Sequence, residues 1–380
     1  MAGLNLIFVG FLPPNSHSSE ERVFIELLSA CFSQTVVFQG IGVKGLDLRI
    51  MKALPSRIAK AHLPAHSSRV RAGVLPVLPI RRGLAARLTT RMIRQRLLRV
   101  TKGRFGEWVF WTRFPSPELV DAIHGLPFER VIYEAVDRYS NGAWFSSSER
   151  ERIAVAEAQI VRLATVVTTS AGLARRFEHA VGGSFSLPLG KDSRLRARNS
   201  RRIDHIARPR LAVVGSLDWL ADEAILVQLA IKRPRWQLVL VGPRDPAWGH
   251  QLQGLANVHW LGKLAPDEAR GVIADCDVAL NPCVLNEWTE FAIPVKIFDY
   301  LAEGRPIVST PMPELNIFQG VIELAASNQF VEAVERAMRT DGPEAAARRR
   351  ATSDQFTLQE RARQAMMLMA PVEGVSRRLA

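Results

Sequence analysis

The sequence has few cysteines and no long hydrophobic run. Its three cysteines are Cys31, Cys276 and Cys283. Because they are odd in number and unclustered, they supply neither a disulfide framework nor a metal-binding spacing. No stretch approaches the ~20 apolar residues that a membrane-spanning helix needs. No basic residue precedes Arg22, although a signal peptide needs one before its apolar core. We therefore expect a cytoplasmic protein that at most rests on a membrane surface.

The sequence also lacks the signatures of nucleic-acid-binding modules. No helix-turn-helix, zinc finger or RNA-recognition motif is found, and the arginine-rich stretches are not interleaved with stacking aromatics. The net charge of +13 nevertheless implies an anionic partner, such as nucleic acid, acidic lipid or a phosphorylated substrate. We expect acidic lipid and a phosphorylated substrate, and no nucleic acid.

What is present is an alternation of strands and helices over 380 residues, enough for two domains. Strands are predicted at residues 4–10, 36–38, 109–111, 131–136 and 165–169, with helices at 81–104 and 150–163. A second series has strands at 211–215, 237–241, 258–260, 278–281 and 306–309, with helices at 222–231, 266–274, 294–302 and 329–338. The prediction is an α/β protein with two Rossmann-like domains, 1–190 and 209–352. A basic linker is predicted at 191–208, and a C-terminal helix within 353–380 that crosses back to the first domain.

Residues 281–304 carry the strongest chemical signal. A buried strand ends at Asn281, a polar loop follows, and Pro294 opens a helix. A helix start at the carboxyl edge of a parallel sheet offers free N–H groups to phosphate. Lys296, one turn into that helix, adds a positive charge, and Asp299 suits a sugar hydroxyl such as that of a ribose. The alternative is an ordinary amphipathic helix on which Lys296 and Asp299 form a solvated pair.

This segment, continued through residues 305–310, resembles the donor-site signature P-x-K-x-[FY]-[ED]-Y-L-A-x-G-x-P-V-V-S-T of GT-B glycosyltransferases. Its form is that of TuaH-like and glycosyltransferase family 4-like enzymes of bacterial cell-surface polysaccharide synthesis. Residues 211–216, 238–243 and 257–262 match that family in order and spacing. Residues 131–137, 168–170 and 187–190 match it more weakly. The resemblance implies the GT-B fold: two doubly wound domains facing across a cleft, with the acceptor in the first and the nucleotide sugar in the second.

The resemblance also implies roles for single residues. Lys296 is expected at the donor pyrophosphate and Asp299 at the ribose; Gly215 and Ser216 would meet the phosphates, and Asn286 and Glu287 would approach the transferred sugar. Two positions depart from the family pattern, with Phe291 where many members have Glu and Leu189 where they have Asn. Neither a metal nor another cofactor is expected, because the helix start and Lys296 would take the place of a metal ion at the diphosphate.

Two residues are candidates for activating the acceptor. Asp137 follows the strand 131–136 at the ligand-facing edge of its sheet, where a carboxylate can act as general base. Some similar enzymes use an Asp in this region, and the alternative is a loop Asp that caps the next helix. Glu134, within the strand, is the reserve candidate. His17, in the loop after the first strand, can bind acceptor or act as a base, and the alternative is a merely exposed side chain.

The helix at 81–104 is basic and amphipathic. Apolar residues recur along it at helical spacing, flanked by arginines that include Arg87, Arg91 and Arg94. Such a helix can lie in a membrane interface and attract anionic lipid, which fits an acceptor saccharide on a polyprenyl diphosphate. The alternative is a helix that packs its apolar face inward and leaves its arginines in solvent.

Together these features predict a glycosyltransferase at the cytoplasmic membrane face, in exopolysaccharide, capsule or cell-wall glycan synthesis. It would move a sugar from a nucleotide donor to a hydroxyl of a lipid-linked or polysaccharide acceptor. UDP is preferred over GDP because it is commoner among such enzymes. The alternative is a basic membrane- or nucleic-acid-binding protein on a catalytically degenerate GT-B scaffold. The retained Lys296 and Asp299 argue against it.

Overall fold

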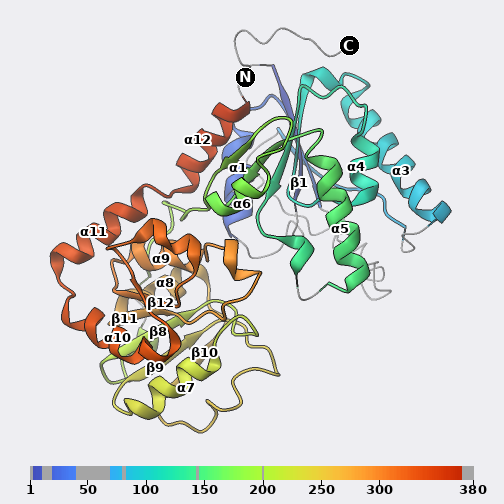
Figure 1. Ribbon diagram of the computed structural model, residues 1–380. Coiled ribbons are helices and arrows are strands. Elements are labelled where there is room, and N and C mark those ends of the chain that lie inside the picture. Colours follow the sequence, from blue (N-terminus) through green and yellow to red (C-terminus); the bar gives the residue numbers. More distant parts are fainter. Residues whose placement is uncertain are drawn as a thin grey trace. The chain divides into compact units, whose positions relative to one another are not determined.

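The computed structural model describes residues 3–10, 19–39, 69–78, 83–142, 145–198 and 201–369. The chain divides into two compact units, which are described separately. The first comprises Met1–Leu187 and Arg361–Ala380, and the second comprises Pro188–Glu360. Each unit is built on one parallel sheet (Figure 1). Within these ranges, no helix has both the length and the apolar character to cross a bilayer.

The first unit has a seven-stranded sheet in the order β3-β2-β1-β4-β5-β6-β7, in which all neighbours are parallel. The strands are β1 (Asn5–Gly10), β2 (Thr35–Gln39), β3 (Val70–Val74), β4 (Trp108–Thr112), β5 (Arg130–Ala135), β6 (Thr165–Thr168) and β7 (Ser184–Ser186). The helices are α1 (Ser19–Ser29), α3 (Gly83–Thr101), α4 (Pro117–Ile123), α5 (Ser147–Ile160) and α6 (Ala171–Arg176). The strand order reverses beside β1, as in doubly wound folds.

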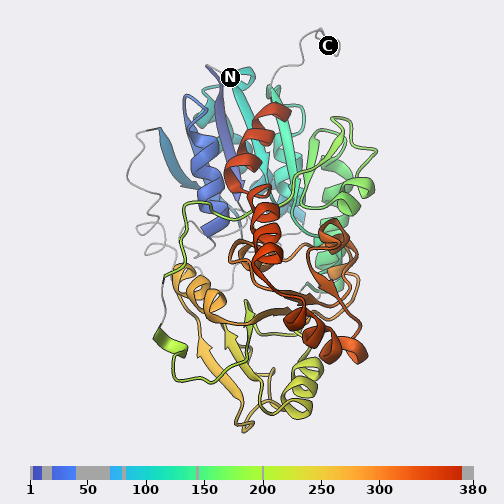
Figure 2. The same cartoon turned by 90° about the vertical axis from the view of Figure 1, so that its left-hand side faces the viewer.

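Helices cover both faces of this sheet because its central strand is apolar on both sides. Successive side chains of a strand point to opposite faces. Leu6 and Phe8 of β1 share a buried cluster with side chains of α1 and α12 (Leu358–Met369). Figures 1 and 2 show these two helices on the same side of the sheet. Ile7 and Val9 face α3 and α4. All four side chains are fully buried, so β1 fixes the centre of the core.

The second unit repeats this design with six parallel strands in the order β10-β9-β8-β11-β12-β13. The strands are β8 (Arg210–Val214), β9 (Gln237–Val241), β10 (Val258–Gly262), β11 (Val278–Asn281), β12 (Ile307–Ser309) and β13 (Glu323–Leu324). The helices are α7 (Glu223–Lys232), α8 (Pro266–Asp275), α9 (Lys296–Ala302), α10 (Phe330–Arg339) and α11 (Pro343–Asp354). The predicted fold, with two Rossmann-like units on doubly wound sheets, is confirmed.

The arginine-rich stretch 191–208 is not a linker between the units. It belongs to the second unit, where Ile203 and Ile206 are buried against its sheet and α8. Arg202 pairs with Glu268 of α8 at 3.1 Å. Two buried isoleucines are enough to attach the segment, and its arginines obscure them in the sequence. By its contacts the chain passes from the first unit to the second after Leu187, close to the predicted position after residue 190.

Candidate functional site

Two glycines bring the ends of β8 and β9 into close contact. Gly242 has φ +144°, and an added Cβ there would lie 1.8 Å from the carbonyl oxygen of Gly215. Gly215 has φ +127°, and its N–H donates to the Val241 carbonyl at 2.9 Å. Both φ values lie in the region that favours glycine. Residues 215–216, with Ser216 exposed, therefore form a narrow backbone loop at the carboxyl edge of the sheet, where an anion can approach the main chain.

Lys296 lies over this loop. An added Cβ at Gly215 would be 3.4 Å from Lys296 Cε and 3.5 Å from its Nζ. Burial raises the pKa of the nearby Cys283 thiol, and the positive charge of Lys296 opposes that rise. Within the described part of the chain, Lys296 forms no ion pair. A half-buried ammonium without a counter-ion, beside a glycine loop, is suited to an anionic ligand.

The helix that carries Lys296 is shorter than the sequence predicts. α9 begins at Lys296 and has seven residues. Pro294 and Val295 form a tight turn before it, since their carbonyls accept from the N–H groups of Ile297 and Phe298 at 3.0 and 3.1 Å. Lys296 is thus the first helical residue, not one turn into the helix. A helix of two turns has a weak dipole, so the lysine charge carries most of the attraction for an anion.

Tyr300 holds α9 against the sheet. Its ring is fully buried, and its hydroxyl accepts from the Val214 N–H at 2.9 Å and donates to the Leu280 carbonyl at 3.2 Å. Val214 ends β8, and Leu280 belongs to β11. One hydroxyl therefore ties α9 to both central strands and fixes Lys296 relative to Gly215.

Asp299 lies among other charged groups of the second unit. Its Oδ1 is 4.0 Å from Arg270 Nε. Burial raises the pKa of its carboxyl to about 6 against the opposing effect of Arg270, although 32% of the side chain stays exposed. The charge of Glu303 also raises the pKa of this carboxyl, and the charge of Lys191 lowers it. The Lys296–Asp299 pair considered from the sequence is not formed. Asp299 keeps an accessible carboxyl one turn along α9.

The loop after β11 is organised by Asn286. Its Oδ1 accepts from the N–H groups of Trp288 and Thr289 at 2.9 and 3.1 Å, and its own N–H donates to Thr289 Oγ1 at 2.9 Å. Asn286 therefore shapes the turn, which limits the part its side-chain oxygen can take in binding a sugar. Glu287, beside it, is exposed.

In the first unit, Asp137 lies just beyond the carboxyl end of β5. It is half-buried, and burial raises the pKa of its carboxyl to about 7. Over the described ranges, this carboxyl has no hydrogen-bond or ion-pair partner. A general base is most effective when its pKa is near the working pH. Asp137 therefore remains a candidate for the general base. His17, the other acid–base candidate, lies outside the described residues.

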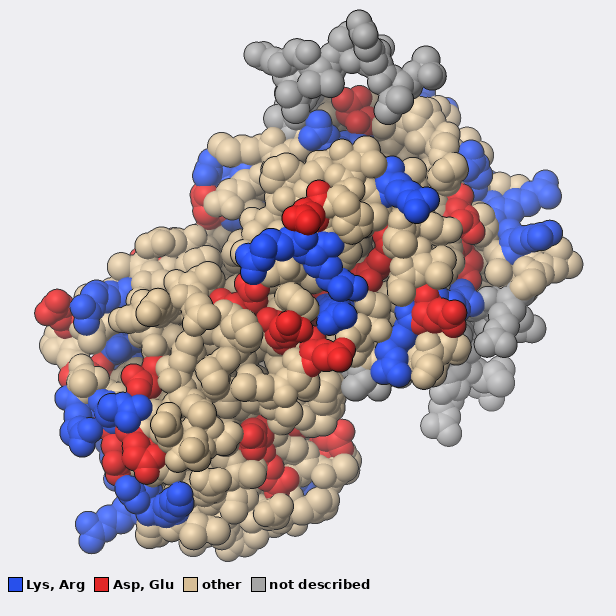
Figure 3. Space-filling model, viewed as in Figure 1, with Lys and Arg blue, Asp and Glu red and all other residues tan. Residues whose placement is uncertain are grey.

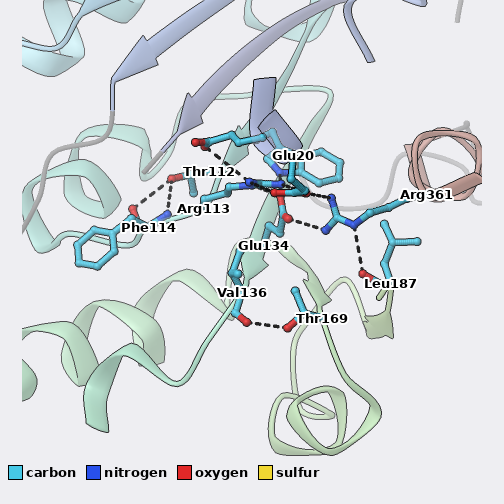
Figure 4. Close-up of polar contacts among 11 residues, drawn as sticks. Glu20, Thr112, Arg113, Phe114, Glu134, Val136, Thr169, Leu187 and Arg361 are labelled. Atoms are coloured by element: carbon cyan, nitrogen blue, oxygen red, sulfur yellow. Dashed lines mark hydrogen bonds and ion pairs between the residues drawn. The ribbon is translucent and has the colours of Figure 1, made fainter. Parts of the chain in front are cut away.

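Glu134, the reserve candidate, has a different role. It is fully buried in β5 and accepts from Trp111 Nε1 at 2.7 Å, Arg113 Nε at 2.9 Å and Arg361 Nη2 at 2.6 Å (Figure 4). These two arginines lower the pKa of its carboxyl to about 2, although burial alone would raise it. A carboxylate held ionised by two arginines is a poor proton acceptor, so Glu134 is unsuited to act as the general base.

The buried ion network around Glu134 joins distant parts of the chain. Arg113 follows β4 and also donates to Glu20 of α1 at 3.3 Å. Arg361 belongs to α12, and its Nε donates to the Leu187 carbonyl at 3.4 Å. Sequence analysis missed this network because its members are up to 341 positions apart. No short sequence motif indicates that these residues are in contact.

α3 presents an exposed surface that is both apolar and basic. Leu84 is 73% exposed, and Leu88, Met92 and Leu98 are also exposed. Arg87 and Arg91 are exposed among them, and residues 83–101 include no acidic residue. Figure 3 shows basic side chains protruding at the edge where α3 lies in Figure 1. The inner face of the helix buries Ile93 and Leu97 in the core.

Arg94 does not belong to this surface. It is half-buried, and its Nη1 donates to the carbonyls of Ala122 and His124 at 3.2 and 2.9 Å. These carbonyls lie at the C-terminal end of α4, where a cation is favoured. Arg94 therefore fastens α3 to α4. We remove it from the candidate membrane-facing residues.

No group of three or more His, Cys, Asp or Glu residues that could hold a metal ion occurs among the residues described above. Lys296 and the main chain around Gly215 could instead hold an anionic ligand.

The second unit matches a known family. Residues 206–340 match the family of glycosyl transferases group 1. The match covers the glycine loop at residues 215–216, the loop after β11 and α9.

Sequence and structure comparisons agree with this match. The chain is 24% identical over 258 residues to TuaH of Bacillus subtilis (strain 168), a protein named for teichuronic acid biosynthesis and glycosyl transfer. That alignment spans 62% of this chain and 64% of TuaH, less than two thirds of the relative. HepE of Anabaena, solved in complex with UDP and glucose, has a TM-score of 0.63 and 16% identity. Sucrose-phosphate synthase of Thermosynechococcus elongatus has a TM-score of 0.69 and 16% identity. Each of these two comparisons covers 96% of this chain and 98% of the other. The second unit thus matches the family of glycosyl transferases group 1, and the chain as a whole shares its fold of two doubly wound units with these solved structures.

Proposed function

We propose that this protein transfers a sugar from a nucleoside diphosphate donor to a hydroxyl of a lipid-linked saccharide or polysaccharide. The observation that carries the proposal is the Lys296 ammonium, which lies over the Gly215 loop without a counter-ion. A diphosphate would place its charge between that ammonium and the main-chain N–H groups of residues 215–216. Asp299, with its accessible carboxyl, would accept hydrogen bonds from the ribose hydroxyls.

Sugar transfer requires the protein to stabilise the leaving diphosphate and to remove a proton from the acceptor hydroxyl. As the bond between the anomeric carbon and the diphosphate oxygen breaks, negative charge grows on the leaving group, and Lys296 stabilises it. As the acceptor oxygen bonds to the anomeric carbon, it loses its proton, and Asp137 takes it. The scheme includes no metal ion, because Lys296 and the glycine loop supply the positive charge.

For the donor we propose a UDP-sugar. HepE, which shares the fold, is solved with UDP and glucose, and UDP is common among enzymes with this donor signature. A parallel for the acceptor is TuaH, named for teichuronic acid biosynthesis. We therefore propose a role in the synthesis of a bacterial surface polysaccharide, on an acceptor carried by polyprenyl diphosphate.

We propose that α3 brings this acceptor within reach by resting on the cytoplasmic face of the membrane. Its exposed leucines can enter the interface while Arg87 and Arg91 meet anionic headgroups. Each arginine near an anionic surface contributes about 1 kcal/mol. The three cysteines are all free, which is consistent with a reducing compartment.

A donor panel tests the activity. UDP- and GDP-sugars are incubated with the protein and a polyprenyl-diphosphate-linked disaccharide, and release of the nucleotide is measured. We expect turnover with at least one UDP-sugar, and none in the Lys296→Ala variant. If no nucleotide sugar turns over and none binds, the chain is a degenerate scaffold and the proposal is wrong.

Flotation with vesicles tests the membrane surface. The wild type should float with vesicles of phosphatidylglycerol and phosphatidylcholine, and R87E/R91E should not. The matched control is R339E/R348E, which reverses two exposed arginines of α10 and α11. If R87E/R91E floats as well as the control, α3 is not the membrane-binding surface.

A further inference from the structure

Three consecutive hydroxyl residues close β6, and each makes a separate hydrogen bond. Thr168 Oγ1 donates to the Ser170 carbonyl at 2.8 Å. Ser170 Oγ accepts from the Leu173 N–H at 3.3 Å and so caps α6. Both of these bonds stay within their own turn, although Thr168 Oγ1 also lies 3.5 Å from the Phe185 carbonyl of β7, on the side away from β5. Thr169 Oγ1 instead reaches the neighbouring strand and donates to the Val136 carbonyl at 2.6 Å.

The Thr169 bond extends the pairing of β5 and β6 by one step. The ladder between these strands ends at the pair Ala135–Thr168. Beyond it the chains diverge, because residues 169–170 turn into α6. The Thr169 side chain is 2% exposed, so its hydroxyl is held in place and substitutes for a missing main-chain donor. Figure 4 shows this contact, beside the ion network of Glu134.

This bond fixes the peptide that precedes Asp137. The Val136 carbonyl belongs to the same planar unit as the Asp137 N–H, so holding that oxygen sets the plane. The next peptide is held as well, because the Tyr139 N–H donates to the Asp137 carbonyl at 3.0 Å. The buried Tyr139 ring packs edge-on against Phe114 at 5.2 Å. With both flanking peptides fixed, only side-chain rotation is left to Asp137.

The charged groups around this turn are engaged elsewhere. Arg138 follows Asp137, and its positive charge opposes the rise that burial causes in the pKa of Glu157. Arg113, Glu134 and Glu21 lie around Tyr139 and belong to the ion network. Burial alone accounts for the raised pKa of Asp137, so a loosened turn that admits water would bring it down.

We infer that Thr169 is a positioning residue for transfer, whose hydroxyl holds the turn that aims Asp137 at the acceptor. The inference rests on the proposed role of Asp137 as general base. It assigns a function to Thr169, the middle residue of the segment 168–170, which matches the family weakly in sequence. The hydroxyl is the essential part, and the methyl group of Thr169 only fills space.

The test compares four variants. Thr169→Val keeps the shape of the side chain and removes the hydroxyl, whereas Thr169→Ser keeps the hydroxyl. Thr168→Val is the matched control, because it removes a buried hydroxyl bond one residue away that does not reach Val136. Asp137→Asn identifies the Asp137 signal in protein carrying ¹³C at aspartate carboxyls. Titration of that signal needs no substrate, and steady-state kinetics are added with the UDP-sugar found by the donor panel.

We expect the Asp137 carboxyl to titrate near pH 7 in the wild type, T169S and T168V, and about one pH unit lower in T169V. T169V should lose roughly 10- to 100-fold in kcat, while KM for the donor changes less than about twofold, because misaimed groups slow chemistry without weakening remote contacts. T169S should have the wild-type pKa of Asp137 and the wild-type kcat. The inference is overturned if T169V titrates and turns over like the wild type, or if T168V is impaired equally. An active D137N would instead refute the base assignment in the proposed function.

Discussion

Replacing Arg361 by methionine should destabilise the first unit strongly, although the residue lies near the C-terminal end of the chain. Its side chain is 1% exposed and donates to Glu134 Oε1 at 2.6 Å, and its guanidinium lies 4.2 Å from the centre of the Phe24 ring. Methionine keeps much of the length and apolar contact of arginine. What it removes is one of two cations that hold a fully buried carboxylate.

Two routes give the size of the effect. Removing one partner of a buried pair costs about 3–5 kcal/mol, and the lower end applies because Glu134 keeps Arg113 and Trp111. The fall in the pKa of Glu134 from 4.5 to about 2 corresponds to about 3 kcal/mol of stability, which Arg113 and Arg361 supply together, so it is an upper limit for the part of Arg361 in this effect. Because the folded pKa is the lower one, this stability is present above pH 4.5 and is lost as the pH falls toward 2.

Hydrogen exchange read by mass spectrometry suits a chain of two units, because it reports each unit separately. In R361M, core peptides of β4, β5 and α12 should exchange about 100-fold faster, which corresponds to roughly 3 kcal/mol. Peptides of β8 and β9 should keep the wild-type rate. The control is R336M, which breaks an exposed pair with Glu323 and should cost less than about 1 kcal/mol. If R361M changes exchange no more than R336M does, the network does not stabilise the first unit.

Further predictions concern the two sheet edges. Turnover should rise as the pH increases through about 7, because Asp137 must lose its proton to act as base. The D137N variant should not show this rise, and a D137N pH profile equal to that of the wild type would remove Asp137 from the mechanism. Gly242→Ala should abolish nucleotide binding, since its Cβ would overlap the Gly215 carbonyl at 1.8 Å and φ is +144°. Calorimetry checks this, and normal exchange in β4 and β5 shows that the first unit is intact; wild-type affinity would mean that the glycine loop is not the phosphate site.

The fold could be predicted because most strands are short apolar runs between helical segments. β1, β9 and β11 are predicted to within about one residue for this reason. β3 and β13 were not predicted, because β3 exposes Arg71 and Ala72 and β13 has only two residues. Neither has an apolar pattern of its own, so only pairing with a neighbouring strand makes it a strand.

The donor side of the site was more predictable than the acceptor side. Gly215, Lys296 and Tyr300 belong to two local motifs, so sequence spacing already indicates that they act together. The contacts of Glu134 and Asp299 depend on which distant side chains reach them. A carboxylate in a strand has the same appearance in sequence whether it is a base or a buried ion pair.

Calorimetric titration with UDP tests the central claim most directly, namely that the second unit binds a nucleoside diphosphate at Gly215 and Lys296. The account predicts saturable binding to the wild type and roughly 10- to 100-fold weaker binding to K296A, which loses one charge-assisted contact worth about 1.5–3 kcal/mol. R336A, a cation on α10 far in sequence from the loop, should bind UDP as the wild type does. Equal affinities for wild type and K296A, or no binding of UDP or GDP at millimolar concentration, would contradict the account.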